Sequence, residues 1–118
     1  MDPHPIKNEV VRALEDIKAR DIEILDVRHM TTLCDYMIIA SADSTRQTRA
    51  LAHNVEERLR EMGAAILGTE GNLSGEWILV DLGSVVVHVM QPAVREYYNL
   101  SELWGGSWRL PLRVASHG

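Results

Sequence analysis

Two apolar runs joined by Gly83-Ser84 constrain this chain more than any other part of its sequence. The runs cover residues 77–82 (WILVDL) and 85–90 (VVVHVM). Glycine accepts a positive φ angle, so Gly-Ser is a favourable two-residue connection for an antiparallel hairpin. The position of the turn sets the register, because a shift of one residue would move every side chain to the opposite face.

The two faces of the predicted hairpin differ in character. One face is wholly aliphatic and therefore needs a core. The other face is mixed: it is too apolar for ordinary solvated surface, yet it carries a carboxylate and an imidazole. Either a helix of the same chain covers this mixed face, or a partner protein does. The register pairs Trp77 with Met90, Leu79 with His88 and Asp81 with Val86 on the mixed face.

Length and composition indicate one domain that acts on proteins rather than on bare nucleic acid. A chain of 118 residues can bury one core. Its net charge of −5 disfavours a phosphate backbone as the main binding surface and suits a basic protein partner. Cys34 is the single cysteine, so an intrachain disulfide is not possible. The sequence shows neither a membrane span nor a signal peptide, so we expect a cytoplasmic protein with irregular ends at residues 1–5 and 107–118.

The periodicity along the chain predicts a mixed sheet of about five strands with helices packed on it, an α/β or α+β domain. We expect Lys7 to point away from the sheet, Asp21 and Glu23 to lie on a solvated strand face, and Met62 to be buried. Ser44, followed by Gln47, matches a capping box at the start of the longest helix. Helices are predicted from about residue 6 to 20, after Ser44 to Gly63, and from Pro92 through Tyr97 and Tyr98 towards Trp104; strands are predicted at 21–27, 35–40, 64–68, 77–82 and 85–90.

The candidates for chemistry do not combine into a catalytic apparatus. Asp35, Asp43 and Asp81 lie at strand ends, where α/β proteins often place reacting groups, but isolated carboxylates there are usually turn or capping residues. Cys34 beside a buried strand is more often a small core residue than a nucleophile. The five histidines are too dispersed to indicate a metal site, and the glycines of residues 68–75 match no phosphate-binding fingerprint. We therefore expect no cofactor, no metal and no catalytic residue.

The same residues resemble a known family. Glu70-Gly71, the run from Gly75 to Met90, the REYYNL segment at 95–100 and Leu103-Trp104 strongly resemble the ribosomal silencing factor family, also called the Iojap family. The resemblance covers about residues 6 to 105. Ser101 stands where an acidic residue is commoner, and Met90 where an aromatic residue is frequent.

The resemblance implies a fold similar to that of nucleotidyltransferases, without their activity. Those enzymes place a Gly-Ser ahead of a metal-binding Asp-x-Asp pair. Here Gly83-Ser84 is followed by Val-Val-Val-His, and the chain contains no Asp-x-Asp. The alternative hypothesis is a nucleotidyltransferase-like enzyme that uses Asp81 or Asp35 with a metal.

The resemblance further implies a translational repressor that acts when nutrients are short. Members of the family bind the large ribosomal subunit through its protein L-fourteen and sterically block joining of the small subunit. On this basis we expect the mixed hairpin face to contact the partner, while Tyr97 and Trp104 pack inside the domain. The same apolar face could instead form a homodimer. The expected partner-binding residues are Glu76, Trp77, Leu79, Asp81, His88, Met90 and Tyr98.

Overall fold

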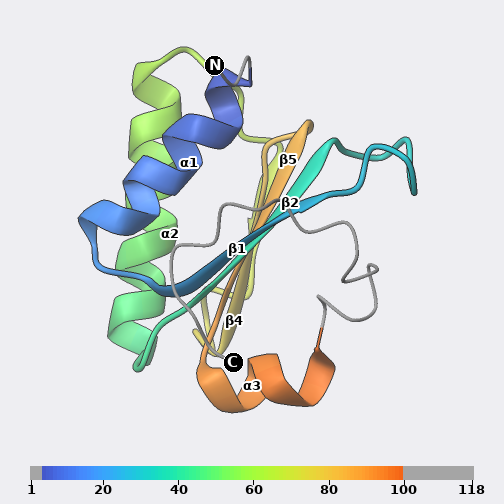
Figure 1. Ribbon diagram of the computed structural model, residues 1–118. Coiled ribbons are helices and arrows are strands. Elements are labelled where there is room, and N and C mark those ends of the chain that lie inside the picture. Colours follow the sequence, from blue (N-terminus) through green and yellow to red (C-terminus); the bar gives the residue numbers. More distant parts are fainter. Residues whose placement is uncertain (1–3, 100–118) are drawn as a thin grey trace.

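The computed structural model describes residues 4–99, which form a five-stranded mixed sheet and three helices (Figure 1). The order along the chain is helix, strand, strand, helix, three strands, helix, as the sequence predicts. The predicted α+β class is therefore confirmed. The elements are α1 (Pro5–Asp16), β1 (Arg20–Asp26), β2 (Tyr36–Ser41), α2 (Thr45–Glu61), β3 (Gly68–Glu70), β4 (Trp77–Asp81), β5 (Val85–Met90) and α3 (Pro92–Tyr98).

The strands lie in the order β1-β2-β5-β4-β3. β2 and β5 pair in parallel, and the other neighbours pair antiparallel. The hairpin register is confirmed: Trp77 pairs with Met90, and Asp81 pairs with Val86. Gly83 has φ +84° in the turn, the conformation for which glycine is needed. β5 is thus the central strand, with β2 on one side and β4 on the other.

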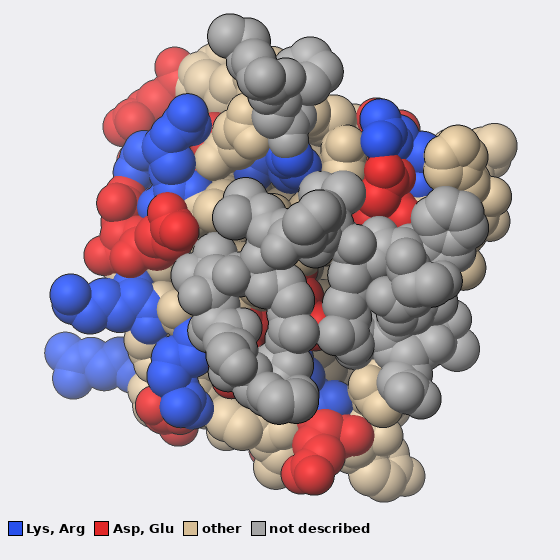
Figure 2. All heavy atoms as spheres, viewed as in Figure 1, with Lys and Arg blue, Asp and Glu red and all other residues tan. Residues whose placement is uncertain are grey.

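The aliphatic face of the hairpin is the main core, and α1 and α2 cover it (Figure 1). The two helices are joined by a hydrogen bond from Asn54 Nδ2 to the Ala13 carbonyl (2.8 Å) and by ion pairs from Arg58 to Glu9 and Asp16. Acidic and basic side chains are interspersed along this side of the molecule (Figure 2). Hairpin residues in the core include Ile78, Val80, Leu82, Val85, Val87 and Val89.

The prediction that Ser44 caps α2 is also confirmed, although Gln47 Oε1 accepts from the Asp43 amide (3.1 Å) rather than from the Ser44 amide of a full capping box. Ser44 Oγ accepts a hydrogen bond from the Gln47 amide (3.1 Å), and Gly63 follows the helix with φ +84°. Met62, however, is 43% exposed, so its predicted burial is wrong. The reason is that Met62 is the C-cap, where the chain leaves the helix.

Several predicted boundaries and orientations are wrong. α1 ends at Asp16 rather than near residue 20, because Lys18 adopts a positive φ of 62° and the chain turns. Pro5, predicted to be irregular, begins this helix. Lys7, predicted to point outwards, is buried with its ammonium 5.0 Å from the centre of the Tyr36 ring. β3 lies at Gly68–Glu70 rather than at 64–68, since it must reach the register of β4.

α3 ends at Tyr98, where Asn99 takes a left-handed conformation with φ 48°. The sequence predicted a longer helix, which Asn99 terminates. The predictions for Trp104 and for residues 107–118 lie outside the described residues.

Candidate functional site

A hydrogen bond between Trp77 and His88 lies at the centre of the mixed hairpin face. The two side chains come from directly neighbouring strands, and Trp77 Nε1 donates to His88 Nδ1 over 2.9 Å. His88 is only 5% exposed, and burial lowers its pKa from 6.5 to about 4. The imidazole is therefore neutral near pH 7, and Nδ1 is available to accept the indole proton.

Tyr98 of α3 extends this arrangement to the surface. Its ring centroid lies 4.8 Å from that of Trp77, and Tyr97 packs edge-on against Tyr98 at 5.0 Å. Tyr98 is 52% exposed, Trp77 and Leu79 are half-buried, and Glu76 is exposed. Trp77, Leu79 and Asp81 alternate along β4, so these three side chains share one face of the sheet. Glu76 directly precedes the strand, and Tyr98 comes from α3. We call Glu76, Trp77, Leu79, Asp81 and Tyr98 the aromatic surface.

Two of the predicted partner-binding residues lie beneath this surface. Met90 is fully buried and His88 nearly so. The domain itself therefore covers these two side chains, and their predicted role in partner binding stays a prediction. The hairpin face is partly covered by its own chain, because a second apolar cluster joins it to β1, β2 and the turn before β2. This cluster contains Leu25, Val27, Cys34, Met37, Ile39 and Met90, with Trp77, Val86 and Val94 packed against it.

Tyr97 also departs from its prediction. It is 81% exposed, whereas packing inside the domain was expected. Residues 97 and 98 are consecutive positions at the end of a short helix, and neither is buried there. Both tyrosines therefore present ring surface to solvent.

The carboxylates proposed for metal chemistry have local partners. Asp81 Oδ1 accepts a hydrogen bond from the Gly83 amide (2.9 Å), which closes the hairpin turn. Asp35 Oδ2 lies 3.4 Å from His4 Nε2. In the described part of the chain, no three His, Cys, Asp or Glu side chains gather closely enough to hold a metal ion.

The sequence reasoning missed an ion pair that joins α3 to β1. Arg95 of α3 forms an ion pair with Glu23 of β1, whose side chain is 4% exposed. Glu23 was expected on a solvated face, and that prediction is wrong. The REYY segment, which places an arginine three residues before Tyr98, was the one signal that could have indicated the pairing.

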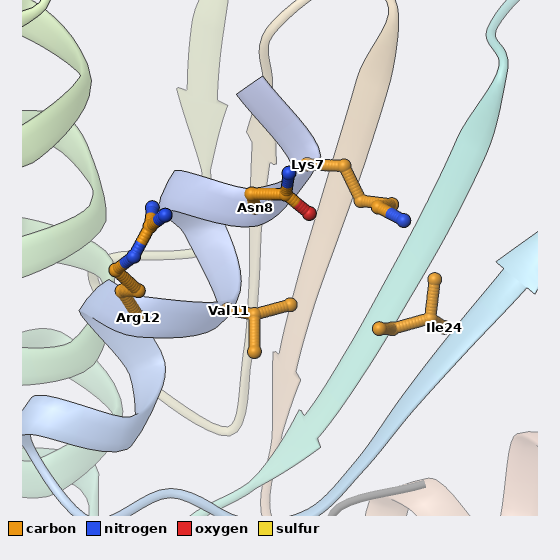
Figure 3. Close-up of a pocket in the computed structure, with 5 residues that line it drawn as sticks. All are labelled: Lys7, Asn8, Val11, Arg12 and Ile24. Carbon is orange, nitrogen blue, oxygen red and sulfur yellow. The ribbon is translucent and has the colours of Figure 1, made fainter. Parts of the chain in front are cut away.

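A shallow pocket of about 180 Å³ lies apart from the aromatic surface, between α1 and β1. Lys7, Asn8, Val11 and Arg12 line it from the helix, and Ile24 lines it from the strand (Figure 3). It contains none of the predicted partner-binding residues. Separately, no helix within residues 4–99 has the length and apolar character needed to span a membrane.

The fold and the site together define a small α+β domain with Trp77, Leu79 and Asp81 on one face of its sheet and two exposed tyrosines at the end of α3. Comparisons with known proteins give its family. The model of the family described as "Ribosomal silencing factor during starvation" matches residues 2–116. The chain belongs to the ribosomal silencing factor family, whose members regulate ribosomes.

Individual relatives agree with this assignment. Ribosomal silencing factor RsfS of Chromobacterium violaceum is 53% identical over 106 residues, which cover 90% of this chain and 87% of the relative. The protein of the same name from Bacillus subtilis is 37% identical and covers 89% of each chain. The chloroplastic protein Iojap of Zea mays is 31% identical over 87% of this chain, although only 45% of that longer protein is covered.

Solved structures show the same fold. A crystal structure of a Chromobacterium violaceum protein has a TM-score of 0.86 at 48% sequence identity, covering 98% of this chain and 95% of that one. A crystal structure of a Bacillus halodurans protein has a TM-score of 0.82 at 33% identity, covering 92% and 98%. The fold similarity to nucleotidyltransferases that the resemblance implies stays a prediction.

Proposed function

We propose that this chain represses translation by binding the large ribosomal subunit through ribosomal protein L-fourteen and sterically blocking the joining of the small subunit. Membership of the ribosomal silencing factor family supports a ribosomal partner. Its place of action would be the cytoplasm, with the ribosomes. Steric blocking requires no reacting groups, only a surface that binds tightly at the right place.

The aromatic surface is the single observation that carries this proposal. Trp77 and Tyr98 form a ring pair at the surface, and such aromatic anchors dominate the energetics of protein interfaces. The hydrogen bond to His88 holds the indole in one orientation, so less side-chain entropy is lost on binding. Asp81 lies on the same face of β4 as Trp77, and the exposed Glu76 directly precedes Trp77 in the chain; this negative charge suits a basic ribosomal protein. Buried Met90 and His88 support this surface from beneath.

A cosedimentation assay tests the proposal. Trp77→Glu should abolish binding to purified large subunits and restore joining of the small subunit, while the circular dichroism spectrum stays that of the folded protein. The exposed Leu33, in the loop between β1 and β2, offers a control, since Leu33→Glu introduces the same charge elsewhere. A folded Trp77→Glu protein that still binds would remove the aromatic surface from the interface.

The second candidate function is a nucleotidyltransferase-like enzyme with a metal at Asp81 or Asp35. Both carboxylates already have partners, since Asp81 accepts from the Gly83 amide and Asp35 lies beside His4. This favours the binding function over the enzyme. Calorimetry with ATP, CTP and GTP in the presence of Mg²⁺ distinguishes the two. Metal-dependent nucleotide binding that Asp81→Asn removes would favour the enzyme.

Self-association through the aromatic surface is a separate question. A homodimer that used this surface would have to dissociate before the same surface could contact the ribosome. Sedimentation of the purified protein at several concentrations, alone and as Trp77→Glu, measures whether the same residues mediate both contacts.

A further inference from the structure

α3 carries half of the aromatic ring pair, yet its apolar attachment to the domain is small. No residue of this helix is fully buried. Val94 packs only partly against the second apolar cluster, and Tyr98 is half-exposed over Trp77. A seven-residue helix is also too short to be stable in isolation. Among residues 4–99, hydrophobic burial therefore contributes little to fixing the position of Tyr98.

Arg95 connects α3 to the sheet through three hydrogen bonds. Its Nη1 donates to the Asp21 carbonyl (2.6 Å) and to Ser41 Oγ (2.8 Å), while Nη2 donates to Glu23 Oε1 (2.7 Å). The three acceptors come from two different strands. A planar guanidinium that is held by three acceptors in different directions fixes both the place and the orientation of the residue that carries it.

An irregularity in β1 shapes the site that binds the Arg95 guanidinium. The register with β2 shifts between Arg20 and Glu23, which marks a β-bulge. Asp21, inside the bulge, has φ 50°, a conformation that costs free energy for a residue other than glycine. The strained residue is the one whose carbonyl accepts from Arg95. Backbone strain of this kind persists where the surroundings hold it in place, and it concentrates at functional positions.

The ion pair is shielded from solvent, with side-chain exposures of 15% for Arg95 and 4% for Glu23. A buried pair of this kind adds little net stability compared with apolar side chains of the same size. The ion pair instead favours one geometry, because any arrangement that separates Arg95 from Glu23 leaves a buried charge without its partner. This selects the arrangement in which α3 stays against β1 and β2.

We propose that Arg95, held by Glu23 and the bulge of β1, is a positioning residue that keeps Tyr98 against Trp77 and so maintains the aromatic surface in its binding-competent form. The proposal rests on the proposed function, because it concerns the affinity of the same surface for a ribosomal protein. Arg95 itself is mostly buried and acts through Tyr98.

Hydrogen–deuterium exchange of the full chain tests the positioning without the ribosome. In Arg95→Met the amides of α3 should exchange at least about tenfold faster, while the amides of β5 keep their wild-type protection. Arg12→Met is the matched control, since Arg12 also pairs with a glutamate but is 58% exposed on α1. Unchanged exchange of α3 in a folded Arg95→Met protein would overturn the proposal.

Binding to purified large subunits tests whether the positioning is used. Arg95→Met should weaken binding about tenfold, as expected for the loss of one interface anchor. Loss of positive charge cannot explain a weaker affinity for a basic partner, and Arg12→Met should bind as the wild type does. Arg95→Lys, which keeps the charge but lacks the guanidinium fork, should fall between the two.

The combination with Tyr98→Ala distinguishes a positioning residue from a general stabiliser. If Arg95 acts through Tyr98, the double variant binds no more weakly than Tyr98→Ala alone. Multiplying losses would overturn the proposal. If Arg95→Met does not fold, Glu23→Gln replaces it, and a folded Glu23→Gln protein with wild-type affinity would also overturn it.

The two levels of inference fail in different ways. A wild-type chain that does not bind large subunits refutes the proposed function. A chain whose binding depends on Trp77 and Tyr98 but not on Arg95 leaves the proposed function standing and refutes only the positioning role.

Discussion

The buried His88 makes the stability of the domain depend on pH in a defined direction. Its pKa is about 4 in the folded protein, because burial disfavours the charged imidazolium, against an ordinary value of 6.5. As the pH falls below about 6.5, the unfolded chain takes up a proton that the folded chain does not. The stability that His88 contributes is therefore fully present above about pH 6.5 and is lost progressively down to about pH 4.

The size of the effect follows from the two pKa values. A separation of about 2.5 between them corresponds to about 3 kcal/mol over the whole window, and to about 2 kcal/mol between pH 7 and about pH 5. The second figure is the better target, since most carboxylates are still ionised at about pH 5. It is a large part of the total stability of a small domain.

His88→Asn is the perturbation that isolates this contribution. The Asn Oδ1 atom can take the place of His88 Nδ1 as the acceptor for Trp77 Nε1, but it does not titrate. Urea unfolding of both proteins at pH 7 and about pH 5 gives four free energies of unfolding. The wild type should lose about 2 kcal/mol more than the variant between the two pH values.

The reasoning would be refuted by equal pH dependence in the two proteins. It would equally be refuted if the wild type became relatively more stable at low pH, because that sign requires a folded-state pKa above the unfolded one. A direct titration of the His88 ring protons by nuclear magnetic resonance provides an independent check.

Three further predictions concern the turns and the aromatic surface. Ser44→Ala removes the acceptor for the Gln47 amide and should lower the free energy of unfolding by about 1 kcal/mol in thermal or urea unfolding; an unchanged value would show that the cap contributes nothing. Gly71→Ala should lower the free energy of unfolding by about 2–3 kcal/mol, because Gly71 has φ +93° and an added Cβ would lie 2.0 Å from a backbone carbonyl oxygen. Gly68→Ala is the control: the space around Gly68 is open, so this variant should change the free energy of unfolding by less than about 0.5 kcal/mol. Similar losses in the two variants would contradict the steric argument. Asp81→Asn keeps an acceptor for the turn amide but removes the charge, so it should leave stability unchanged and weaken large-subunit binding several-fold, and wild-type binding at low salt would remove that charge from the interface.

Local patterns made most of the fold predictable. The hairpin register followed from a Gly-Ser turn between two apolar runs, all within one short stretch of sequence. The start of α2 followed from Ser44 and Gln47 in the same way. The boundary of β3 was not predictable, because its position depends on pairing with β4 rather than on its own three residues.

The environment of charged residues was the least predictable part of the site. Glu23 reads as a solvated strand residue, and its partner Arg95 lies far away in the sequence. Similarly, the burial of Met90 and His88 depends on packing with distant β-strands and on what covers the sheet face. Nothing in the periodicity of the hairpin distinguishes a face that a partner covers from one that the same chain partly covers. The aromatic pair of Trp77 and Tyr98, by contrast, was within reach of the sequence, since both residues were expected on one surface.

The parallel pairing of β2 with β5 has a consequence for how this chain must acquire its structure during synthesis. The antiparallel pair β1 and β2 can form from local contacts, and so can the later antiparallel strands. The parallel pairing that starts at Tyr36 and Val85, by contrast, joins segments that leave the ribosome at very different times. Until β5 leaves the exit tunnel, β2 exposes one hydrogen-bonding edge and two apolar faces. The nascent chain is thus most prone to aggregation in the interval before its central strand appears, and variants that slow translation between α2 and β5 should lengthen that exposure.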